Sequence, residues 1–434
     1  MKVSFYTFGC KVNQYETQAM RYMLSERGAQ TDEYLPGDGI YRDAVVINSC
    51  TVTAESDRKL RQLLRRCRRE NPSSIIILTG CMPQAFPQKA AALDDADIIL
   101  GNAERSLLPE MLENYKLSPH TITRVPEHGS TYEPLQIDTF DGRTRAFIKI
   151  QDGCNRFCSY CIIPYARGRV RSRQPEDLHK EVMSLAQKGY REIVLVGINL
   201  SAYGQDIGSD LAHAVEVVCS VDGIQRVRLG SLEPDYMTPD IIDRLAQLPK
   251  LCPQFHFALQ SGCDATLKRM NRHYTTGEYA ALCHYLRQRF PGCALTTDVM
   301  VGFPGETEQE FSQSLAFVES IHFSRVHVFA YSRRPGTVAD RMNDQLSHAK
   351  KAERSHLMIQ AAKISADLYA ADYIGKTVEV LLETPLDDDH VEGHTTTYLT
   401  VHAHTSQASG TVIPVRITGG NGEYLVGEEV INNE

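Results

Sequence analysis

The sequence lacks several features that would assign it to particular classes of protein. No run of roughly 18 apolar residues occurs in it, so we expect no membrane-spanning helix and no membrane partner. Its first residues lack the positively charged segment, apolar stretch and cleavage site of a signal peptide, which predicts a cytoplasmic protein. No residue class is strongly over-represented, and this disfavours wholesale disorder.

Disulfide bonds are not expected, although the chain contains 12 cysteines. The cytoplasm keeps thiols reduced, so many cysteines there indicate metal binding or catalysis. Simple packing is predicted for five that lack a partner at ligand spacing, which are Cys67, Cys219, Cys252, Cys283 and Cys293.

An overall excess of positive charge is also absent, because the net charge of −8 by itself disfavours a nucleic-acid partner. The charge is uneven, however. Residues 371–434 contain eleven acidic and two basic side chains, a net charge of −9, which leaves +1 for residues 1–370. Two basic clusters in that larger part suit phosphate. They are Arg58, Lys59, Arg61, Arg65, Arg66, Arg68 and Arg69, and then Arg167, Arg169, Arg171 and Arg173.

Residues 1–115 are predicted to form a small parallel α/β domain. The apolar strand candidates, separated by helical patterns, are Val3–Phe8, Ala44–Ile47 and Ile75–Thr79. Each candidate leads into a cysteine, at Cys10, Cys50 and Cys81. Ligands of an open parallel sheet bind outside the carboxyl ends of its strands, so these thiols can converge on an iron–sulfur cluster or a zinc ion. The alternative is that each is a small buried residue.

The rest of the chain divides into three parts. Residues 116–143, punctuated by proline and glycine, are predicted to be a linker. In residues 144–370, six strand candidates alternate with helical patterns, which indicates an open partial α/β barrel with its active site at the carboxyl rim. These candidates are Ala146–Ile150, Glu192–Gly197, Arg226–Gly230, Phe255–Leu259, Leu295–Val301 and Val326–Tyr331. Short β-rich runs in residues 371–434 predict a small β-barrel.

The most specific motif is the loop that contains Cys154, Cys158 and Cys161, with the spacing C-x3-C-x2-C. Zinc sites usually pair cysteines as C-x2-C and need a fourth ligand, and no other Cys or His lies close by in this loop. A [4Fe–4S] cluster held by three cysteines leaves one iron open for S-adenosylmethionine, which an electron from the cluster can cleave. A spacing of this kind after the first strand of a β/α array is the signature of radical S-adenosylmethionine enzymes.

Several motifs resemble the radical S-adenosylmethionine methylthiotransferases, and they are spread over the whole chain. Apart from the cysteine loop they are residues 10–16, 48–53, 79–81, 162–168, 259–262 and 298–307. The segments 9–17 and 331–337 are most similar to the branch that makes 2-methylthio-N6-threonylcarbamoyladenosine beside the anticodon of tRNA. The branches that modify N6-isopentenyladenosine in tRNA, or an aspartate of a ribosomal protein, remain alternatives. A zinc-bearing RNA-binding module would explain the cysteines but not the barrel.

The resemblance implies an N-terminal cluster domain, a radical barrel and a C-terminal TRAM domain. It also implies two [4Fe–4S] clusters, on Cys10, Cys50 and Cys81 and on the catalytic Cys154, Cys158 and Cys161. S-Adenosylmethionine would serve both as methyl donor and as radical source. The implied partners are tRNA, a flavodoxin-like or ferredoxin-like electron donor and a sulfur source. Two departures from the family are the acidic C-terminal segment and Cys263, which we interpret as a bystander.

Polar residues after the barrel strands are candidates for binding small molecules. Five of them are predicted to bind S-adenosylmethionine, namely Gly197, Asn199, Ser231, Glu233 and Gln260. A guanidinium group suits the carboxylate of a threonylcarbamoyl group, and Arg333 and Arg334 follow the sixth strand. Adjacent residues leaving a strand point to opposite sides, so we expect only one of this pair to face the substrate.

Overall fold

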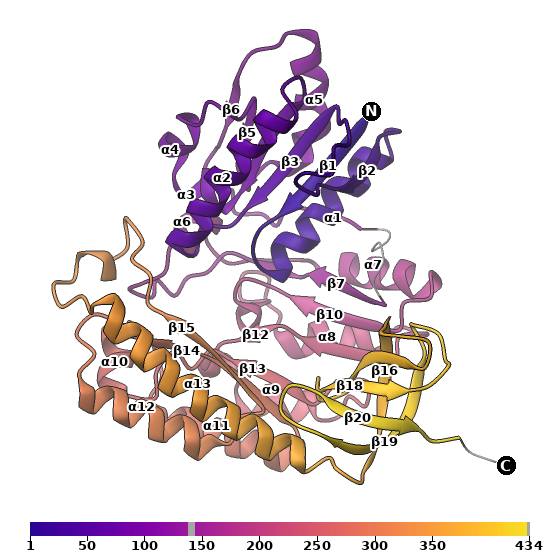
Figure 1. The fold of residues 1–434 in the computed structure, drawn as a ribbon, viewed down its shortest axis with the longest axis vertical. Helices are drawn as coiled ribbons and strands as arrows, with labels where there is room; N and C mark the ends of the chain where they lie inside the picture. The colour runs from indigo at the N-terminus through magenta and orange to yellow at the C-terminus, as the bar shows by residue number, and fades with distance from the viewer. Residues whose placement is uncertain (138–143, 432–434) are drawn as a thin grey trace.

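A computed structural model describes residues 1–137 and 144–431. The chain forms an N-terminal α/β domain, a partial β/α barrel below it in Figure 1, and a small C-terminal β-barrel beside the partial barrel. Residues 138–143 of the predicted linker, and the last three residues of the predicted C-terminal segment, lie outside the described residues.

The N-terminal sheet has six parallel strands in the order β2-β1-β3-β4-β5-β6. Their bounds are β1 Lys2–Thr7, β2 Gln30–Glu33, β3 Ala44–Ser49, β4 Ile75–Gly80, β5 Ile98–Leu100 and β6 Ile122–Arg124. The α-helices are α1 Lys11–Ser25, α2 Ala54–Glu70, α3 Cys81–Ala85, α4 Pro87–Ala91 and α5 Leu108–Leu117, with a 3₁₀ turn at Arg105–Leu107. Helices α1 and α5 pack on one face of the sheet, and α2 to α4 pack on the other.

The first three predicted strands are confirmed as β1, β3 and β4, which are neighbours in the sheet. The sequence did not predict β2, β5 and β6. Strand β6 also corrects the interpretation of residues 116–143 as linker throughout, because Ile122–Arg124 pairs with Ile98–Leu100. A strand of three residues at the edge of a sheet is too short to show a periodic pattern.

The six predicted barrel strands are present, and the barrel is open. Two sheets, β11-β10-β7 and β12-β13-β14-β15, form its wall, so β7 and β15 are the free edges. The strands are β7 Arg145–Lys149, β10 Glu192–Val196, β11 Arg226–Leu229, β12 Ser231–Leu232, β13 Gln254–Phe257, β14 Ala294–Val301 and β15 Arg325–Ala330. A short pair, β8 Gln151–Asp152 and β9 Arg171–Ser172, lies at the rim beside β7.

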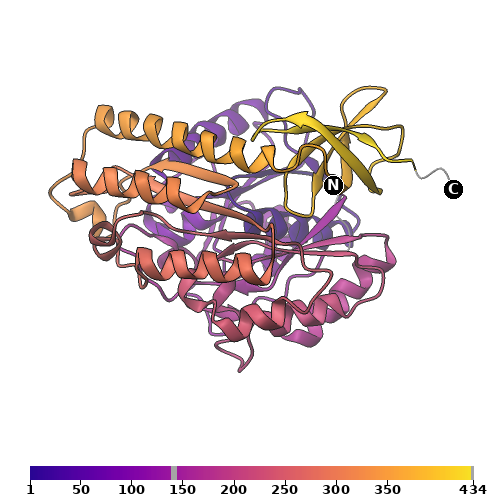
Figure 2. The same cartoon turned by 90° about the horizontal axis from the view of Figure 1, so that it is seen from below.

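Helices cover the outside of this wall, and in Figure 2 they form an outer layer with the N-terminal domain behind. They are α7 Pro175–Gln187, α8 Leu211–Cys219, α9 Pro239–Leu245, α10 Asp264–Arg269, α11 Thr276–Arg289, α12 Glu308–Ile321 and α13 His348–Ala371. The short α6, Ile163–Arg167, follows the cysteine loop, and 3₁₀ turns occur at Leu200–Ala202, Pro234–Tyr236 and Ala339–Arg341. Capping boxes begin α11 at Thr275 and α12 at Thr307.

The C-terminal segment forms a closed barrel in the order β16-β17-β18-β20-β19. Its strands are β16 Thr377–Pro385, β17 His390–Thr395, β18 Thr400–His404, β19 Val412–Gly420 and β20 Leu425–Glu429. This is the architecture expected of a TRAM domain. Across the described part of the chain, no helix has both the length and the apolarity required to cross a membrane.

Candidate active site

The three cysteines of the N-terminal domain come together at the carboxyl ends of β1, β3 and β4. Cys10 is the N-cap of α1, Cys50 follows β3, and Cys81 begins α3. A Cβ atom built on Gly9 would lie 2.9 Å from the Cβ and 3.3 Å from the Sγ of Cys50. Only glycine therefore allows the chain before Cys10 to approach Cys50 so closely.

The surroundings of Cys10 and Cys50 disfavour the negative charge of a thiolate. Burial, together with the nearby Cys81, raises the pKa of Cys50 to about 12. Desolvation by the surrounding protein atoms also raises the pKa of Cys10. Part of the Cys10 side chain nevertheless remains accessible to solvent. Thiols of this kind stay protonated until a cationic centre stabilises the thiolate, which is what binding to iron does.

In the cysteine loop of the barrel, each sulfur atom accepts a hydrogen bond from a nearby N–H group. The backbone N–H groups of Arg156 and Ile163 donate to Cys154 and Cys161, at 3.5 and 3.4 Å. The Arg272 guanidinium donates to the sulfur of Cys158 at 3.3 Å. Such donors stabilise sulfur ligands and tune the potential of an iron–sulfur cluster.

Both groups of cysteines offer three sulfur donors, the donor type that iron–sulfur clusters use. Across residues 1–137 and 144–431, no three His, Cys, Asp or Glu side chains are arranged to hold one metal ion. In a [4Fe–4S] cluster each thiolate binds a different iron, so thiols that converge without meeting at one point suit it.

A buried network of charges lies between the two groups of cysteines. Arg167, at the end of α6, donates to the sulfur of Cys81 at 3.3 Å and to Asn13 at 2.8 Å, and it forms an ion pair with Glu16. Lys149 pairs with Glu16 at 2.9 Å and with Asp152, two residues before Cys154, at 3.0 Å. The N-terminal domain and the barrel thus share one network, and its side chains are almost fully buried.

This network corrects the prediction that the second basic cluster is a phosphate-binding surface. Arg167, Arg171 and Arg173 are all at least 95% buried, and each forms an ion pair with a carboxylate. Only Arg169 is exposed, where its guanidinium lies 4.6 Å from the ring centroid of Phe157. The sequence shows the spacing of these arginines but does not show which acidic residues pair with them.

Two of the residues predicted to bind S-adenosylmethionine lie at the cysteine loop. The side-chain amide of Asn199 lies 3.8 Å from the sulfur of Cys154, and its buried Oδ1 has no hydrogen-bond partner among the described residues. Glu233 forms an ion pair with Arg272, the residue that also contacts Cys158. Sequence reasoning missed Arg272, because nothing in its local pattern distinguishes it from a surface arginine.

The other three predicted cofactor-binding residues lie at the same rim without a direct hydrogen bond to the cysteines. Gly197 follows β10, and a Cβ atom there would come within 2.9 Å of the Gln151 side chain. Ser231 is exposed in β12. Gln260 follows β13 with a φ of 66°, a conformation that costs energy for any residue other than glycine.

The two arginines after β15 point to different surroundings. Arg334 is buried and donates to Thr51 at 2.7 Å and to Asp57 at 2.9 Å, so it connects the barrel to the N-terminal domain. Arg333 is exposed and forms an ion pair with Asp340 at 3.0 Å. That either of them binds the substrate stays a prediction.

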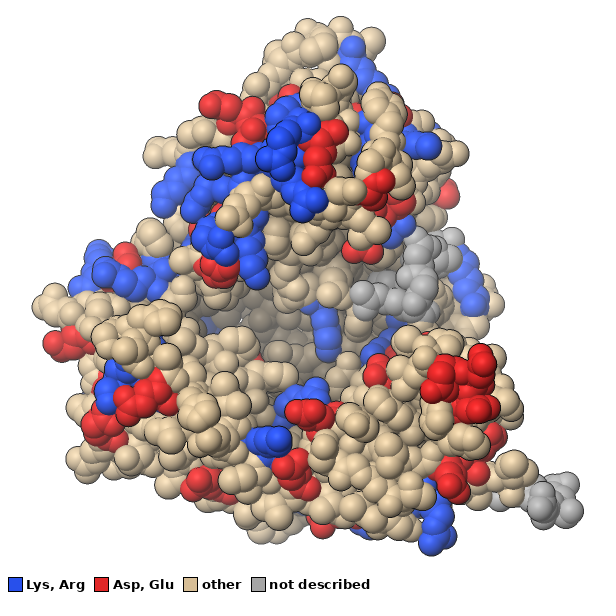
Figure 3. Space-filling view, in the orientation of Figure 1, with Lys and Arg blue, Asp and Glu red and all other residues tan. Residues whose placement is uncertain are grey.

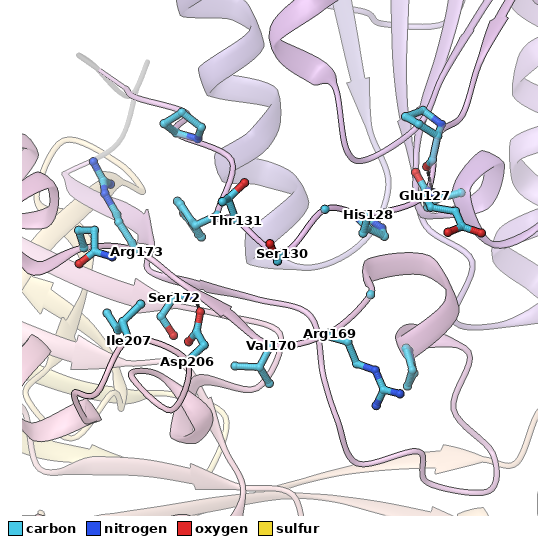
Figure 4. Close-up of a pocket in the computed structure, with 18 of the residues that line it drawn as sticks. Glu127, His128, Ser130, Thr131, Arg169, Val170, Ser172, Arg173, Asp206 and Ile207 are labelled. Atoms are coloured by element: carbon cyan, nitrogen blue, oxygen red, sulfur yellow. Dashed lines mark hydrogen bonds between the residues drawn. The ribbon is translucent and has the colours of Figure 1, made fainter.

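A large pocket lies between the segment after β6 and the start of α7, with a volume of about 1270 Å³ (Figure 4). Its lining combines Glu127 and Asp206 with Arg169 and Arg173, and it contains none of the cysteines. This pocket therefore lies beside the cysteine loop rather than at it.

Comparison with known proteins identifies the family. Residues 148–318 match the radical SAM superfamily, and residues 2–101 match the uncharacterized protein family UPF0004. The threonylcarbamoyladenosine tRNA methylthiotransferase MtaB of Bacillus subtilis is 38% identical, over 99% of this chain and 96% of that protein. A tRNA-2-methylthio-N(6)-dimethylallyladenosine synthase of Clostridium novyi is 34% identical, over 97% of this chain and 95% of that protein. The chain belongs to the radical SAM methylthiotransferases.

Solved structures share the fold of this methylthiotransferase at much lower identity. The radical S-adenosylmethionine methyltransferase TsrM from Kitasatospora setae, with cobalamin and a [4Fe-4S] cluster bound, matches with a TM-score of 0.60 at 14% identity. The match covers 78% of this chain and 77% of TsrM. An α/β domain joined to a radical barrel is thus an arrangement already seen in solved structures.

Proposed function

We propose that this methylthiotransferase converts N6-threonylcarbamoyladenosine, beside the anticodon of tRNA, to its 2-methylthio derivative in the cytoplasm. Relatives named for threonylcarbamoyladenosine are 37 to 39% identical to the chain, against 34 to 35% for relatives named for dimethylallyladenosine. The identities differ little, so isopentenyladenosine in tRNA is the main alternative substrate, and an aspartate of a ribosomal protein is a second one.

In this proposal Cys154, Cys158 and Cys161 hold one [4Fe–4S] cluster, and Cys10, Cys50 and Cys81 hold another. A cluster with an open iron supplies reductive cleavage of S-adenosylmethionine, a step for which ordinary side chains have no suitable chemistry. The rim residues Gly197, Asn199, Ser231, Glu233 and Gln260 would bind and orient that cofactor. The chain would also need an electron donor of the flavodoxin or ferredoxin kind and a source of sulfur.

The observation that carries the proposal is the buried contact of Arg167 with both domains. Arg167 donates to the sulfur of Cys81 in one domain and pairs with Glu16, which Lys149 connects to Asp152 near Cys154. A rigid charged network between two groups of cysteines suits an enzyme that must deliver sulfur from one site and activate carbon at the other. Such alignment matters because small displacements of reacting groups are costly.

Iron content tests the assignment of the clusters. Anaerobically reconstituted protein should hold about eight irons, and the triple variant Cys154→Ala, Cys158→Ala, Cys161→Ala should keep about four. Cys283→Ala is the matched control. Cys283 is buried in the barrel core, so this variant should keep the iron content of wild type. A wild type that never exceeds about four irons would contradict the assignment to the N-terminal domain.

Product analysis tests the substrate. Mass spectrometry of nucleosides should show a 2-methylthio product from tRNA that carries N6-threonylcarbamoyladenosine and none from tRNA that carries N6-isopentenyladenosine. The reverse result, or modification of a ribosomal protein alone, would replace the proposed substrate by one of its alternatives.

A further inference from the structure

The concave face of the open barrel is a polar surface and not a packed core. Along β15 the side chains alternate, because Val326 and Val328 pack against the core while His327 and the 52% exposed Phe329 face the concave side. On β14 and β13, Asp298 and His256 lie on the same side, 3.3 Å apart. The inside of a barrel is normally filled by branched apolar side chains, so this face is suited to hold a polar ligand.

A lysine from the N-terminal domain reaches this concave face. Lys11 is the first residue of α1, directly after Cys10, and its ammonium group lies 5.8 Å from the ring centroids of both Phe147 and Tyr398. Phe147 is on β7, at one free edge of the barrel, and Tyr398 belongs to the C-terminal barrel. Lys11 therefore lies where all three domains meet. Figure 3 shows that the molecule is hollowed between the N-terminal domain and the two barrels.

The charged groups nearest to Lys11 are Arg145, Arg228 and Glu192, and they are paired with other residues. Arg145 and Arg228 also lie against Tyr398, at 5.0 and 4.7 Å from the ring centroid, but both already pair with carboxylates. Arg145 pairs with Glu383 at 3.1 Å, and Arg228 pairs with Glu192 at 3.1 Å. Within the described parts of the chain, no carboxylate or carbonyl oxygen accepts a hydrogen bond from the Lys11 ammonium. A half-buried ammonium that lacks a partner in the protein is suited to an anionic ligand.

We propose that Lys11 binds the carboxylate of the threonylcarbamoyl group and so makes the enzyme selective for that nucleotide. The inference rests on the proposed function. In adenine, carbon 2 and the N6 amino group lie on the same edge of the base. A base that presents carbon 2 to the cysteines would therefore extend its N6 substituent along the same side, toward a cation next to Cys10. A phosphate of the RNA backbone is the other anion with the same chemistry.

The rival cations are less well placed for this role. Arg334 is buried, and one of its guanidinium nitrogens already donates to Thr51 and to Asp57, so its charge is balanced by a carboxylate of the N-terminal domain. Arg333 is 58% exposed and pairs with Asp340, so its charge is already balanced by a neighbour on the surface. Comparing Lys11→Met with Arg333→Met separates the two candidates.

Binding of RNA provides a test that does not depend on turnover. Anticodon stem–loops that carry either N6-threonylcarbamoyladenosine or plain adenosine share the same phosphates, so the ratio of their dissociation constants reports contacts to the threonylcarbamoyl group and not to the backbone. Reconstituted wild type should prefer the modified RNA. Lys11→Met, which keeps the length of the side chain, should reduce that preference about tenfold, and Lys11→Arg should retain most of it. Iron content should be the same in all variants, which excludes loss of the neighbouring cysteine site.

Lys376→Met is the matched control. Lys376 also lies beside a tyrosine ring, at 5.7 Å from the centroid of Tyr373, but on the surface of the C-terminal barrel, so its loss should leave the ratio unchanged.

An equal loss of affinity for both RNAs in Lys11→Met would mean a phosphate contact and would overturn the proposal. So would a wild-type ratio near one, an unchanged ratio in Lys11→Met, or a collapse of the ratio in Arg333→Met instead. If wild type forms the 2-methylthio product while Lys11→Met keeps its preference, only this inference fails. If wild type forms no product from the modified tRNA, the proposed function fails as well.

Discussion

Asn199 shows most clearly, at the scale of single residues, how the rim is prepared for a ligand. Its backbone N–H donates to the Gln151 side chain at 2.8 Å, which fixes the residue, and its amide nitrogen faces the sulfur of Cys154. The remaining oxygen, Oδ1, is buried without a hydrogen-bond partner among the described residues. Leaving such an acceptor unpaired costs about 1 to 3 kcal/mol, so a donor from a bound molecule would be favoured here.

The prediction that follows concerns affinity for S-adenosylmethionine. Asn199→Ala removes the unpaired acceptor and should weaken binding about tenfold in reconstituted protein, with unchanged iron content. Isothermal titration calorimetry measures the affinity. Ser320→Ala is the comparison, because Ser320 is an exposed serine near the end of the outer helix α12 and is not among the proposed cofactor-binding residues. An affinity of Asn199→Ala within twofold of wild type would remove Asn199 from the binding site.

Residue types and spacings were enough to predict the candidate cysteines, but they could not predict which charged side chains are buried. All six proposed cluster cysteines could be predicted, because their placement after strands and the C-x3-C-x2-C spacing are local features. Arg167 and Arg272 could not be placed, because their partners, Glu16 and Glu233, lie 151 and 39 positions away in the chain. The local sequence does not distinguish an arginine that is exposed to water from one that pairs with a buried carboxylate.

Among the elements, α2 has an apolar stripe on one face and arginines on the opposite face. Leu60, Leu63, Leu64 and Cys67 are buried against the sheet. The opposite arginine stripe is not uniform, since Arg58 pairs with Glu55 and Arg68 pairs with Asp97. Arg61 and Arg65 are exposed, and no ion pair to either is found among the described residues. Basic side chains gather on this face of the N-terminal domain in Figure 3.

We expect Arg61 and Arg65 to contact the phosphates of tRNA. The double variant Arg61→Glu, Arg65→Glu should weaken tRNA binding and reduce the slope of log affinity against log salt by about two, roughly one unit for each lost contact. Fluorescence anisotropy over a range of salt concentrations measures this slope. Arg27→Glu, Lys116→Glu is a control with the same change of charge at the other end of the domain, where both residues line one small pocket. Equal slopes for the first variant and wild type would mean that this stripe is only a solvated face.

The strands that sequence analysis missed are short or polar. β2 has the sequence Gln-Thr-Asp-Glu, and β5 and β6 have three residues each. β17 alternates small and polar residues within the closed barrel. Such strands form because a neighbouring strand offers unpaired backbone groups, so their own side chains do not determine them. The longer strands of the N-terminal sheet and of the partial barrel, whose buried side chains alternate or run continuously, were all predicted.

At the scale of the whole molecule, polar contacts between the domains determine how the domains are placed relative to one another. Besides the network at Glu16, the loop after β15 joins the N-terminal domain through Arg334 and Asp57, and the backbone N–H of Ala54 donates to Ser332 at 3.2 Å. On the other side, Arg228 donates to the carbonyl groups of Thr395 and Thr396 in the C-terminal barrel. These polar contacts fix the three domains around the concave face, and no local pattern could have predicted them.

Glu16 is the centre of the junction between the N-terminal domain and the barrel. Although burial opposes its charge, Arg105, Arg167 and Lys149 lower the pKa of this carboxyl to about 2, from an ordinary value of 4.5. Its charge therefore stabilises the fold at any pH above about 4.5, and this contribution is lost as the pH falls toward 2. Replacing Glu16 leaves three buried cations with too little negative charge around them, which is strongly destabilising.

Glu16→Gln keeps the shape of the side chain and removes its charge. At pH 7 it should lower the free energy of unfolding by about 3 to 5 kcal/mol, the range for breaking a buried ion pair. Glu216→Gln provides the contrast, because Glu216 and Arg244 are 35% and 33% exposed, and it should cost at most about 1 kcal/mol. Urea unfolding at pH 7 and at pH 3 measures both variants against wild type. Below pH 4.5 the stabilisation that the charge of Glu16 gives to the wild-type fold begins to decrease. The difference in unfolding free energy between wild type and Glu16→Gln should therefore be smaller at pH 3. A difference below 1 kcal/mol at pH 7, or one that does not shrink at pH 3, would show that the buried charge of Glu16 does not hold the two domains together.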